Sequence, residues 1–157
     1  KISNHMNFEN SSVLDFGAGL GHFYKHLKKK KFKFKQYNYY DINNSLRDFF
    51  KKNNSSKKIR IINKYPSEKF DFIIMNGVHN FNYSLNNKII RKVIKNLFKI
   101  SNKCLGFSFL NNDVDYKEKK LFYHDENKLI TYIKKLSKKI IIDKTFSRFE
   151  TFIFMYK

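Results

Sequence analysis

The chain has 157 residues, of which 41% are apolar and 18% aromatic, and its formal net charge is +20. This length suits one domain with one hydrophobic core. No run of eighteen apolar residues marks a membrane span, and the polar start does not resemble a signal peptide. The only cysteine, Cys104, excludes an internal disulfide and fits a reducing, cytoplasmic compartment. The chain begins at Lys1 rather than Met, which leaves room for residues upstream.

The high positive charge raises the question of a nucleic-acid partner. Only four of the 33 basic residues are arginine, however, and arginine is the better reader of phosphates and base edges. Lysine, asparagine, isoleucine and phenylalanine are abundant together, and their A/T-rich codons suggest a biased composition. We therefore interpret the charge as a solvated lysine surface. Nucleic acid stays an alternative partner that is not favoured, and no membrane partner is expected.

The chain is organised around residues 12–22, which read SVLDFGAGLGH. After a polar lead-in over residues 1–11, with Phe8 as its apolar anchor, the apolar run predicts a buried strand over 12–16. Three glycines at alternate positions end this strand, and a helix is expected over 21–30. A glycine turn between strand and helix brings the backbone close to a ligand, and the helix N-terminus offers free N–H groups. This arrangement is typical of a nucleotide-binding site.

The spacing of the glycines indicates which nucleotide is bound. A dinucleotide-binding turn needs its third glycine at position 22, where His22 stands. The pattern is instead D-x-G-x-G-x-G, beginning at Asp15. It resembles motif I of the class I S-adenosylmethionine-dependent methyltransferases. The alternative is a glycine-rich turn that binds nothing.

A second strand is expected over residues 34–40, and it ends at Asp41-Ile42. An acid at the carboxyl end of the second strand is where a Rossmann-like site meets a ribose. Its alternative role is to cap the next helix, which is expected over 44–53. A short third strand, 59–62, is followed by Asn63 rather than by the acid that the methyltransferase family often has there. Asn63 could substitute as the hydrogen-bond acceptor.

The fourth strand, 70–75, leads into Asn76-Gly77-Val78-His79-Asn80. In a parallel sheet this segment lies beside the glycine turn, and it resembles motif IV of the same family. Methyltransferases of exocyclic base amines carry two prolines and an aromatic residue after the Asn, and cytosine-C5 enzymes need a Pro-Cys pair. Neither signature is present, which argues against a base methyltransferase.

The last third of the chain completes the sheet. We expect a helix over 85–102, a strand over 104–110, a polar substrate loop over 111–125 and a helix over 126–138. Two strands, 139–145 and 151–156, form a closing hairpin. Such an ending is a methyltransferase trait that a plain dinucleotide fold lacks. The expected fold is an α/β, Rossmann-like three-layer sandwich with a seven-stranded, mostly parallel sheet and an antiparallel last strand.

Residues 12–157 resemble a compact bacterial-type class I methyltransferase domain, so the whole chain, 1–157, is taken as one such domain. The resemblance implies S-adenosylmethionine as cofactor and no metal site. Asp41 would hold the ribose, Ile42 would lie against the adenine, and Asn76 and Gly77 would flank the methionine moiety. The full set of cofactor-binding residues that the resemblance implies is Asp15, Gly17, Ala18, Gly19, Gly21, Asp41, Ile42, Asn63, Asn76 and Gly77.

Methyl transfer to a hydroxyl or amine also requires a base, which works best with a pKa near 7. His79 is the first candidate for this catalytic role, because it follows the fourth strand at the mouth of the site. His124 and Tyr116, on the substrate loop, come next. The expected reaction is methyl transfer to oxygen or nitrogen of a small-molecule or sugar-like acceptor. The alternatives are an RNA- or protein-directed methyltransferase, a catalytically degenerate domain and, more distantly, an NAD-dependent oxidoreductase.

Overall fold

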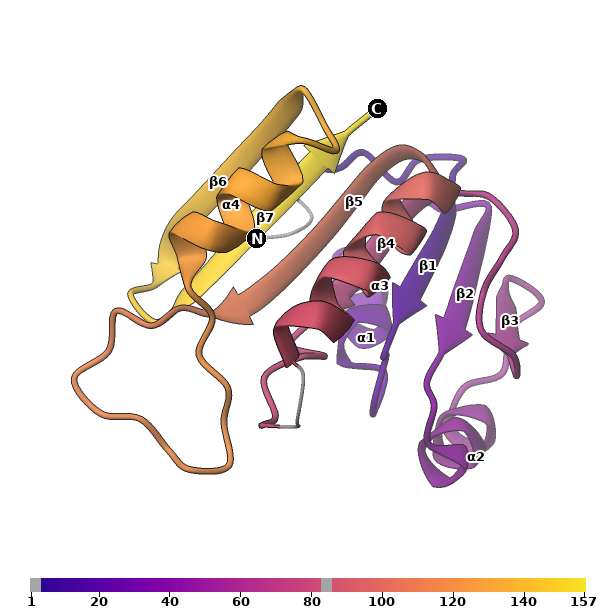
Figure 1. The fold of residues 1–157 in the computed structure, drawn as a ribbon. Coiled ribbons are helices and arrows are strands. Elements are labelled where there is room, and N and C mark those ends of the chain that lie inside the picture. Colours follow the sequence, from indigo (N-terminus) through magenta and orange to yellow (C-terminus); the bar gives the residue numbers. More distant parts are fainter. Residues whose placement is uncertain (1–3, 83–85) are drawn as a thin grey trace.

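The computed structural model describes residues 4–82 and 86–157, and its centre is one seven-stranded sheet with the strand order β3-β2-β1-β4-β5-β7-β6. Figure 1 shows the sheet with helices on both faces. The elements, in chain order, are β1 (Ser12–Phe16), α1 (His22–Lys29), β2 (Gln36–Tyr40), α2 (Asn44–Asn53), β3 (Ile59–Ile62), β4 (Phe70–Asn76), α3 (Asn86–Ile100), β5 (Ser101–Leu110), α4 (Glu126–Lys134), β6 (Lys139–Ser147) and β7 (Glu150–Tyr156).

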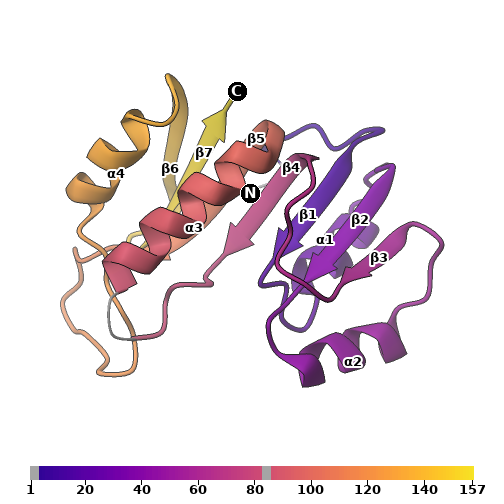
Figure 2. The same ribbon diagram turned by 45° about the vertical axis from the view of Figure 1, so that its right-hand side comes forward.

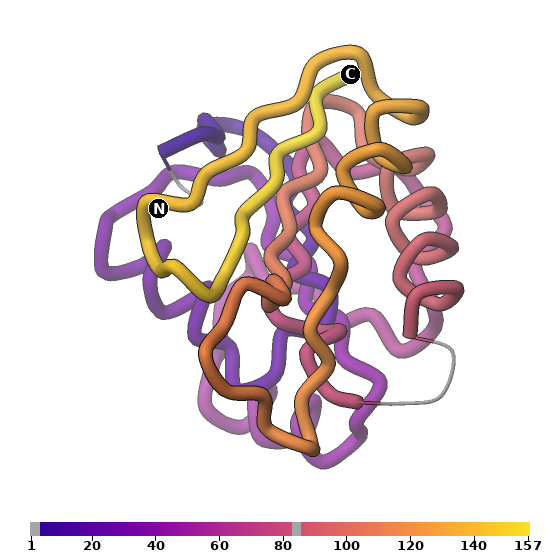
Figure 3. Tube along the Cα trace, turned by 60° about the vertical axis from the view of Figure 1, so that its left-hand side comes forward, coloured from indigo at the N-terminus to yellow at the C-terminus, as the bar shows by residue number. Residues whose placement is uncertain are grey.

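Strands β1 to β5 pair in parallel, whereas β7 pairs antiparallel with both β5 and β6. The last two strands form the expected hairpin, whose arms run side by side in Figure 3. The predicted fold class, including the antiparallel last strand, is therefore confirmed. The carboxyl ends of β1, β2 and β5 point to the same edge of the sheet, where α2 and the loop between β5 and α4 also lie (Figure 1). This edge is where ligands bind in open α/β sheets.

Two hydrophobic clusters fill the two faces of the sheet. One includes Leu14, Ile73 and Leu105 from the strands and packs against α3 and α4. The other includes Val13, Tyr37 and Tyr39 and packs against α1 and α2. Figure 2 shows α3 and α4 on the near face of the sheet and α1 behind it. Successive strand residues alternate between these clusters because side chains of a strand point to opposite faces.

The predicted elements are confirmed, with shifts at several ends. Strand β5 begins at Ser101 rather than at residue 104, because its first residues already pair with β4 at Phe70. Helix α4 ends at Lys134 rather than at residue 138, because the Ser137 hydroxyl donates to backbone carbonyls of Lys139 and Tyr156 and turns the chain into the hairpin. Strand β2 begins at Gln36 instead of residue 34. The expected helix start at Leu85 lies outside the described residues.

Side-chain caps fix the starts of two helices. Asn43 accepts hydrogen bonds from the backbone N–H groups of Ser45 and Leu46 at α2, and Asp125 accepts one from Lys128 at α4. Among residues 4–82 and 86–157, the structure has no helix of the length and apolarity needed to cross a bilayer.

The lead-in segment is anchored, as expected, by Phe8, which is fully buried. Its ring contacts those of Phe23, Phe32 and Phe72 with centroid distances between 5.3 and 5.9 Å. Phe8 thus connects the segment to both α1 and β4.

We expect Phe8→Ala to lower the free energy of unfolding by about 3–5 kcal/mol, the usual cost of emptying such a site. Phe49→Ala is the matched control, because the Phe49 side chain on α2 is 45% exposed. Urea unfolding monitored by circular dichroism measures both changes. Equal losses in the two variants would show that the lead-in segment does not stabilise the domain.

Candidate functional site

The glycine loop that follows β1 is held in place by the end of β2. The backbone N–H groups of Gly17 and Ala18 both donate to the carbonyl of Tyr40, at 2.8 and 3.0 Å. The N–H of Gly19 donates to Oδ2 of Asp41 at 2.9 Å, and the Tyr39 hydroxyl donates to the Gly19 carbonyl at 2.7 Å. The loop is therefore fixed before any ligand arrives.

The three glycines have positive φ angles, but they face different neighbours. A Cβ at Gly17 would lie 2.4 Å from a methyl group of Val78, and a Cβ at Gly21 would lie 2.4 Å from the ring of Phe50. A Cβ at Gly19 would meet nothing within 4 Å. Gly17 and Gly21 thus allow close packing of the protein itself, whereas Gly19 leaves its backbone open to a ligand.

Asp41 is only 7% exposed, and both of its carboxylate oxygens already accept a backbone N–H. Oδ2 accepts from Gly19, and Oδ1 accepts from Asn43 at 2.9 Å. Each carboxylate oxygen can accept a second hydrogen bond, so acceptor capacity is left for sugar hydroxyls. The neighbouring Ile42 side chain is 84% exposed and is available to an aromatic ring.

Beside Asp41, between α2 and the end of β3, the surface is hollowed over a volume of about 430 Å³. The sequence did not predict the polar side of this hollow, because Arg47 belongs to no motif that would mark it as a binding residue. Its guanidinium donates to the backbone carbonyl of Asp41 and so connects the hollow with the end of β2. The lining residues are Asn44, Arg47, Asp48, Lys51, Ile61 and Asn63.

The ends of β4 and β5 form the other half of the site. The Ser108 hydroxyl donates to the side-chain oxygen of Asn76 and accepts from the N–H of Gly77 at 3.2 Å. Asn76 and Ser108 are direct neighbours in the parallel pairing of the two strands. Ser108 was not predicted, because in the sequence it reads as one residue of a buried strand.

His79 and His124 are brought together from segments 45 residues apart. Nε2 of His124 donates to the backbone carbonyl of His79 at 3.3 Å, which leaves Nδ1 of His124 as an acceptor. This Nδ1 and the Nε2 of His79 are both buried and have no hydrogen-bond partner among the described residues. Burial, and in second place the nearby His124, lowers the pKa of His79 to about 4. His79 is therefore neutral at physiological pH.

The three catalytic candidates differ sharply in exposure. His124 is 1% exposed and packs its ring edge-on against Phe109 and Phe122, whereas Tyr116 is 75% exposed. Tyr116 lines a hollow of about 340 Å³ on the substrate loop. His79 is intermediate in exposure. Of the three, only the two histidines are in contact.

Asp15 lies beneath the glycine loop and accepts a hydrogen bond from the Tyr37 hydroxyl. Burial raises the pKa of the Asp15 carboxyl to about 7, the Tyr37 hydrogen bond opposes this rise, and the charge of Asp41 adds to it. Asp15 is only 3% exposed, so it can affect the glycine loop only from the protein interior.

Comparison with known proteins adds to this geometry. A family model described as a methyltransferase domain matches residues 2–126, which is most of the chain. The chain belongs to this methyltransferase domain family. With the sheet order described above, the expected class I S-adenosylmethionine-dependent methyltransferase family is confirmed. Its cofactor is S-adenosylmethionine, again as expected.

Solved structures with this fold are numerous, although none of those compared below is close in sequence. A magnesium protoporphyrin IX methyltransferase from Synechocystis, with bound S-adenosylmethionine, is 15% identical with a TM-score of 0.74, over 99% of this chain and 74% of that one. A methyltransferase from Mesorhizobium loti is 9% identical with a TM-score of 0.68, over 97% and 93%. A chain of the Pnkp1/Rnl/Hen1 RNA repair complex is 10% identical with a TM-score of 0.78, over 99% and 40%. No curated protein matches the sequence.

The residues of this methyltransferase domain fit the cofactor. The Gly19 backbone is open, Asp41 keeps acceptor capacity at the end of β2, and a buried imidazole nitrogen of His79 has no partner in the described part of the chain. All three follow the carboxyl ends of the parallel strands β1, β2 and β4, so they belong to loops at the same edge of the sheet.

The buried Asp15 carboxyl makes stability depend on pH. In the unfolded chain an Asp ionises near pH 4, whereas the folded pKa is about 7. Between these values the folded state holds a proton that the unfolded state has lost, so stability falls as pH rises from about 4 to about 7. Asn at position 15 keeps an acceptor for Tyr37 and cannot ionise.

We therefore expect the stability of Asp15→Asn, relative to the unmodified chain, to increase by up to about 1.4 kcal/mol per pH unit within that window. Urea unfolding at pH 5 and pH 8 measures the effect. A stability difference between the two proteins that is the same at both pH values would contradict the raised pKa.

Proposed function

We propose that this methyltransferase domain transfers a methyl group from S-adenosylmethionine to an oxygen or nitrogen of a small-molecule or sugar-like acceptor. The observation that carries the proposal is the contact between the two loops of the site. Val78 occupies the space next to Gly17, so the glycine loop and the segment after β4 touch each other. A donor held by the first loop would lie beside the residues of the second.

The cofactor roles follow from the contacts. Gly19, supported by Ala18 and its neighbours, would accommodate the methionine part along its open backbone, and Asp41 would accept from the ribose hydroxyls. Ile42 and the hollow at Asn63 would face the adenine. Asn76 and Gly77 are held by Ser108 at the end of β4, close to where the reacting end of the cofactor would be.

When bound, S-adenosylmethionine supplies a methyl group that its positively charged sulfur already activates. The protein therefore contributes mainly alignment, an effect worth up to roughly 7–11 kcal/mol in well-oriented reactions. For a hydroxyl or amine acceptor, a proton must also leave. His79 is the proposed base, because its buried Nε2 has no hydrogen-bond partner among the described residues. Its pKa of about 4 keeps the imidazole unprotonated but lies below the value near 7 that suits a base best.

His124 and Tyr116 take different parts in this scheme. His124 donates to the backbone carbonyl of His79, and this hydrogen bond would hold His79 in position. Tyr116 is exposed on the loop between β5 and α4 and would contact the acceptor at the entrance of the site.

Asp41→Ala should weaken the binding of S-adenosylhomocysteine at least about tenfold, because a charged hydrogen bond contributes about 1.5–3 kcal/mol. Glu9→Ala in the lead-in segment is the matched control, since it removes the same charge from an exposed position outside the hollow. Isothermal titration calorimetry measures both, with NAD as the control ligand. If the unmodified chain does not bind S-adenosylhomocysteine, the catalytic proposal fails and the degenerate domain is the correct interpretation.

His79→Gln should reduce methyl transfer at least about 100-fold while leaving S-adenosylhomocysteine affinity unchanged, since a general base typically contributes that much. Transfer of labelled methyl from S-adenosylmethionine to pools of hydroxyl and amine acceptors measures the rate, and His26→Gln on α1 is the control. The rate for the unmodified chain should fall only as pH approaches about 4, where His79 gains a proton. Full turnover in His79→Gln would assign the proton transfer to another group.

A further inference from the structure

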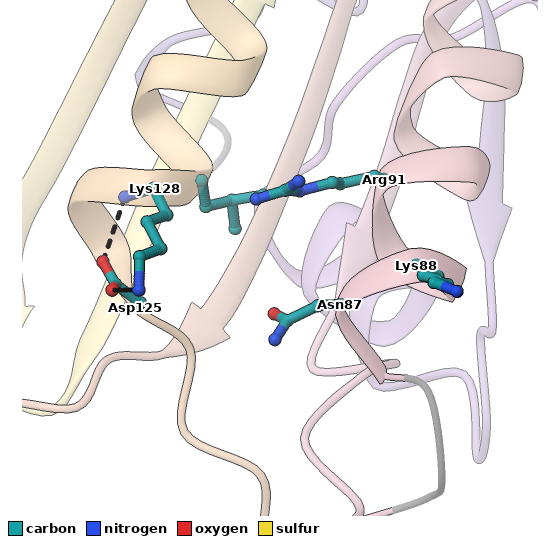
Figure 4. Close-up of a pocket in the computed structure, with 6 residues that line it drawn as sticks. Asn87, Lys88, Arg91, Asp125 and Lys128 are labelled. Atoms are coloured by element: carbon teal, nitrogen blue, oxygen red, sulfur yellow. Dashed lines mark hydrogen bonds and ion pairs between the residues drawn. The ribbon is translucent and has the colours of Figure 1, made fainter.

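A basic groove separates helices α3 and α4, on the face of the sheet opposite α1. Two adjoining hollows of about 280 and 350 Å³ share Arg91 and Lys128. Figure 4 shows the Arg91 side chain extending from α3 across to the first turn of α4. The residues that line the two hollows are Asn87, Lys88, Arg91, Asp125, Asn127, Lys128, Leu129, Thr131, Tyr132 and Lys135.

The charge in this groove is one-sided. The two hollows are lined by four cationic side chains, those of Lys88, Arg91, Lys128 and Lys135, and by one carboxylate, that of Asp125. Asp125 pairs with Lys128 at 3.0 Å and also caps α4, so it cannot neutralise the others. The cations are spread over both helices, with Lys88 and Arg91 on α3, Lys128 in the first turn of α4 and Lys135 just after its end, which matches a polyanion with several phosphates better than a single phosphate.

Arg91 differs from the other arginines of the chain. Arg47, Arg60 and Arg148 each hydrogen-bond or ion-pair with a protein oxygen. The guanidinium of Arg91 has no such partner among residues 4–82 and 86–157, and it lies over the ring of Tyr132 at 5.4 Å. The Tyr132 hydroxyl donates to the Arg91 carbonyl at 3.0 Å and holds the ring there. A planar guanidinium positioned in this way keeps its donors for a phosphate.

A separate hollow lined by aromatic residues lies along the loop between β5 and α4, the loop that leads into α4. The hollow beside Tyr116 is also lined by Tyr123 and Phe149, and Asp125, two residues after Tyr123, lines the groove. Tyr116 is 75% and Phe149 44% exposed. Unpaired bases stack on such rings while cations contact the backbone, which is how single strands are bound without sequence preference.

We propose that the α3–α4 groove binds the phosphate backbone of a single-stranded nucleic acid and that the loop aromatics receive its bases. The proposal that the groove binds the strand does not depend on the proposed methyl transfer. A second step, that the acceptor atom belongs to a nucleotide of this strand, rests on the proposed methyl transfer. The net charge alone did not favour nucleic acid, because few of the basic residues are arginine. This groove differs from the general lysine surface, because the Arg91 guanidinium has no hydrogen bond or ion pair among the described residues and four cations line the two hollows.

The test is fluorescence anisotropy with a labelled single-stranded RNA of about twelve nucleotides, titrated at several salt concentrations. The groove variant combines Lys88→Gln, Arg91→Gln and Lys128→Gln. The matched control combines Lys25→Gln and Lys29→Gln on α1 with Lys30→Gln just after it, which removes the same charge from the opposite face. Losing three phosphate contacts should lower the salt slope by about 2 and the affinity about tenfold or more, and the control should stay within about twofold.

Equal losses in the groove and control variants would overturn the proposal, as would no binding by the unmodified chain. Tyr116→Ala should weaken binding about fivefold or more. A duplex of the same sequence that binds as tightly as the single strand would overturn the assignment to single strands. If the triple groove variant does not fold, Arg91→Gln against Lys29→Gln makes the same comparison.

S-adenosylhomocysteine binding is measured on the same preparations and separates the two proposals. RNA binding without cofactor binding would retain the groove and refute the methyl transfer. Cofactor binding without RNA binding would refute the groove proposal and leave the proposed methyl transfer in place.

Discussion

The geometry of the donor site depends on how the end of β2 holds the glycine loop. The Tyr40 carbonyl accepts two consecutive N–H groups of the loop, and Asp41 accepts a third. A loop with three residues at positive φ would otherwise sample many conformations, since glycine restricts the backbone least. Asp41 therefore has a structural role in addition to its proposed role in binding the ribose, and the cost of ordering the loop is met during folding rather than on binding.

The segment after β4, which we propose to face the acceptor, differs from the glycine loop, because it holds buried polar atoms without hydrogen-bond partners in the described part of the chain. Nε2 of His79 and Nδ1 of His124 are both enclosed without a hydrogen bond among the described residues. Such groups are costly in a folded protein unless a ligand or water completes them. The hydrogen-bonded glycine loop thus contrasts with the two histidine nitrogens, which under the proposed function would gain a partner from a bound substrate.

Much of the fold could be predicted from local patterns in the sequence. The features that were not predicted depend on contacts between residues far apart in the chain. The strand, glycine loop and helix over residues 12–29 were predictable because hydrophobic periodicity and glycine spacing are local signals. The position of Asp41 followed from the parallel pairing of β1 and β2. The burial of His124 was not predictable, because it depends on the carbonyl of His79, 45 residues away. The basic groove could not be predicted from the sequence either, because Arg91 and Lys128 belong to two helices that only the folded sheet brings together.

Val78 and Gly17 occupy one shared volume, because a Cβ at position 17 would overlap a methyl group of Val78. Two positions that compete for the same space are not independent in evolution or in engineering. A smaller residue at position 78 relieves the overlap, although the positive φ at position 17 still favours glycine. The loop that holds the donor and the segment that faces the acceptor are thus coupled by packing, so a change of acceptor preference that enlarges residue 78 also shifts the donor loop. Such epistasis limits how far the acceptor side of this fold can vary while the donor side stays constant.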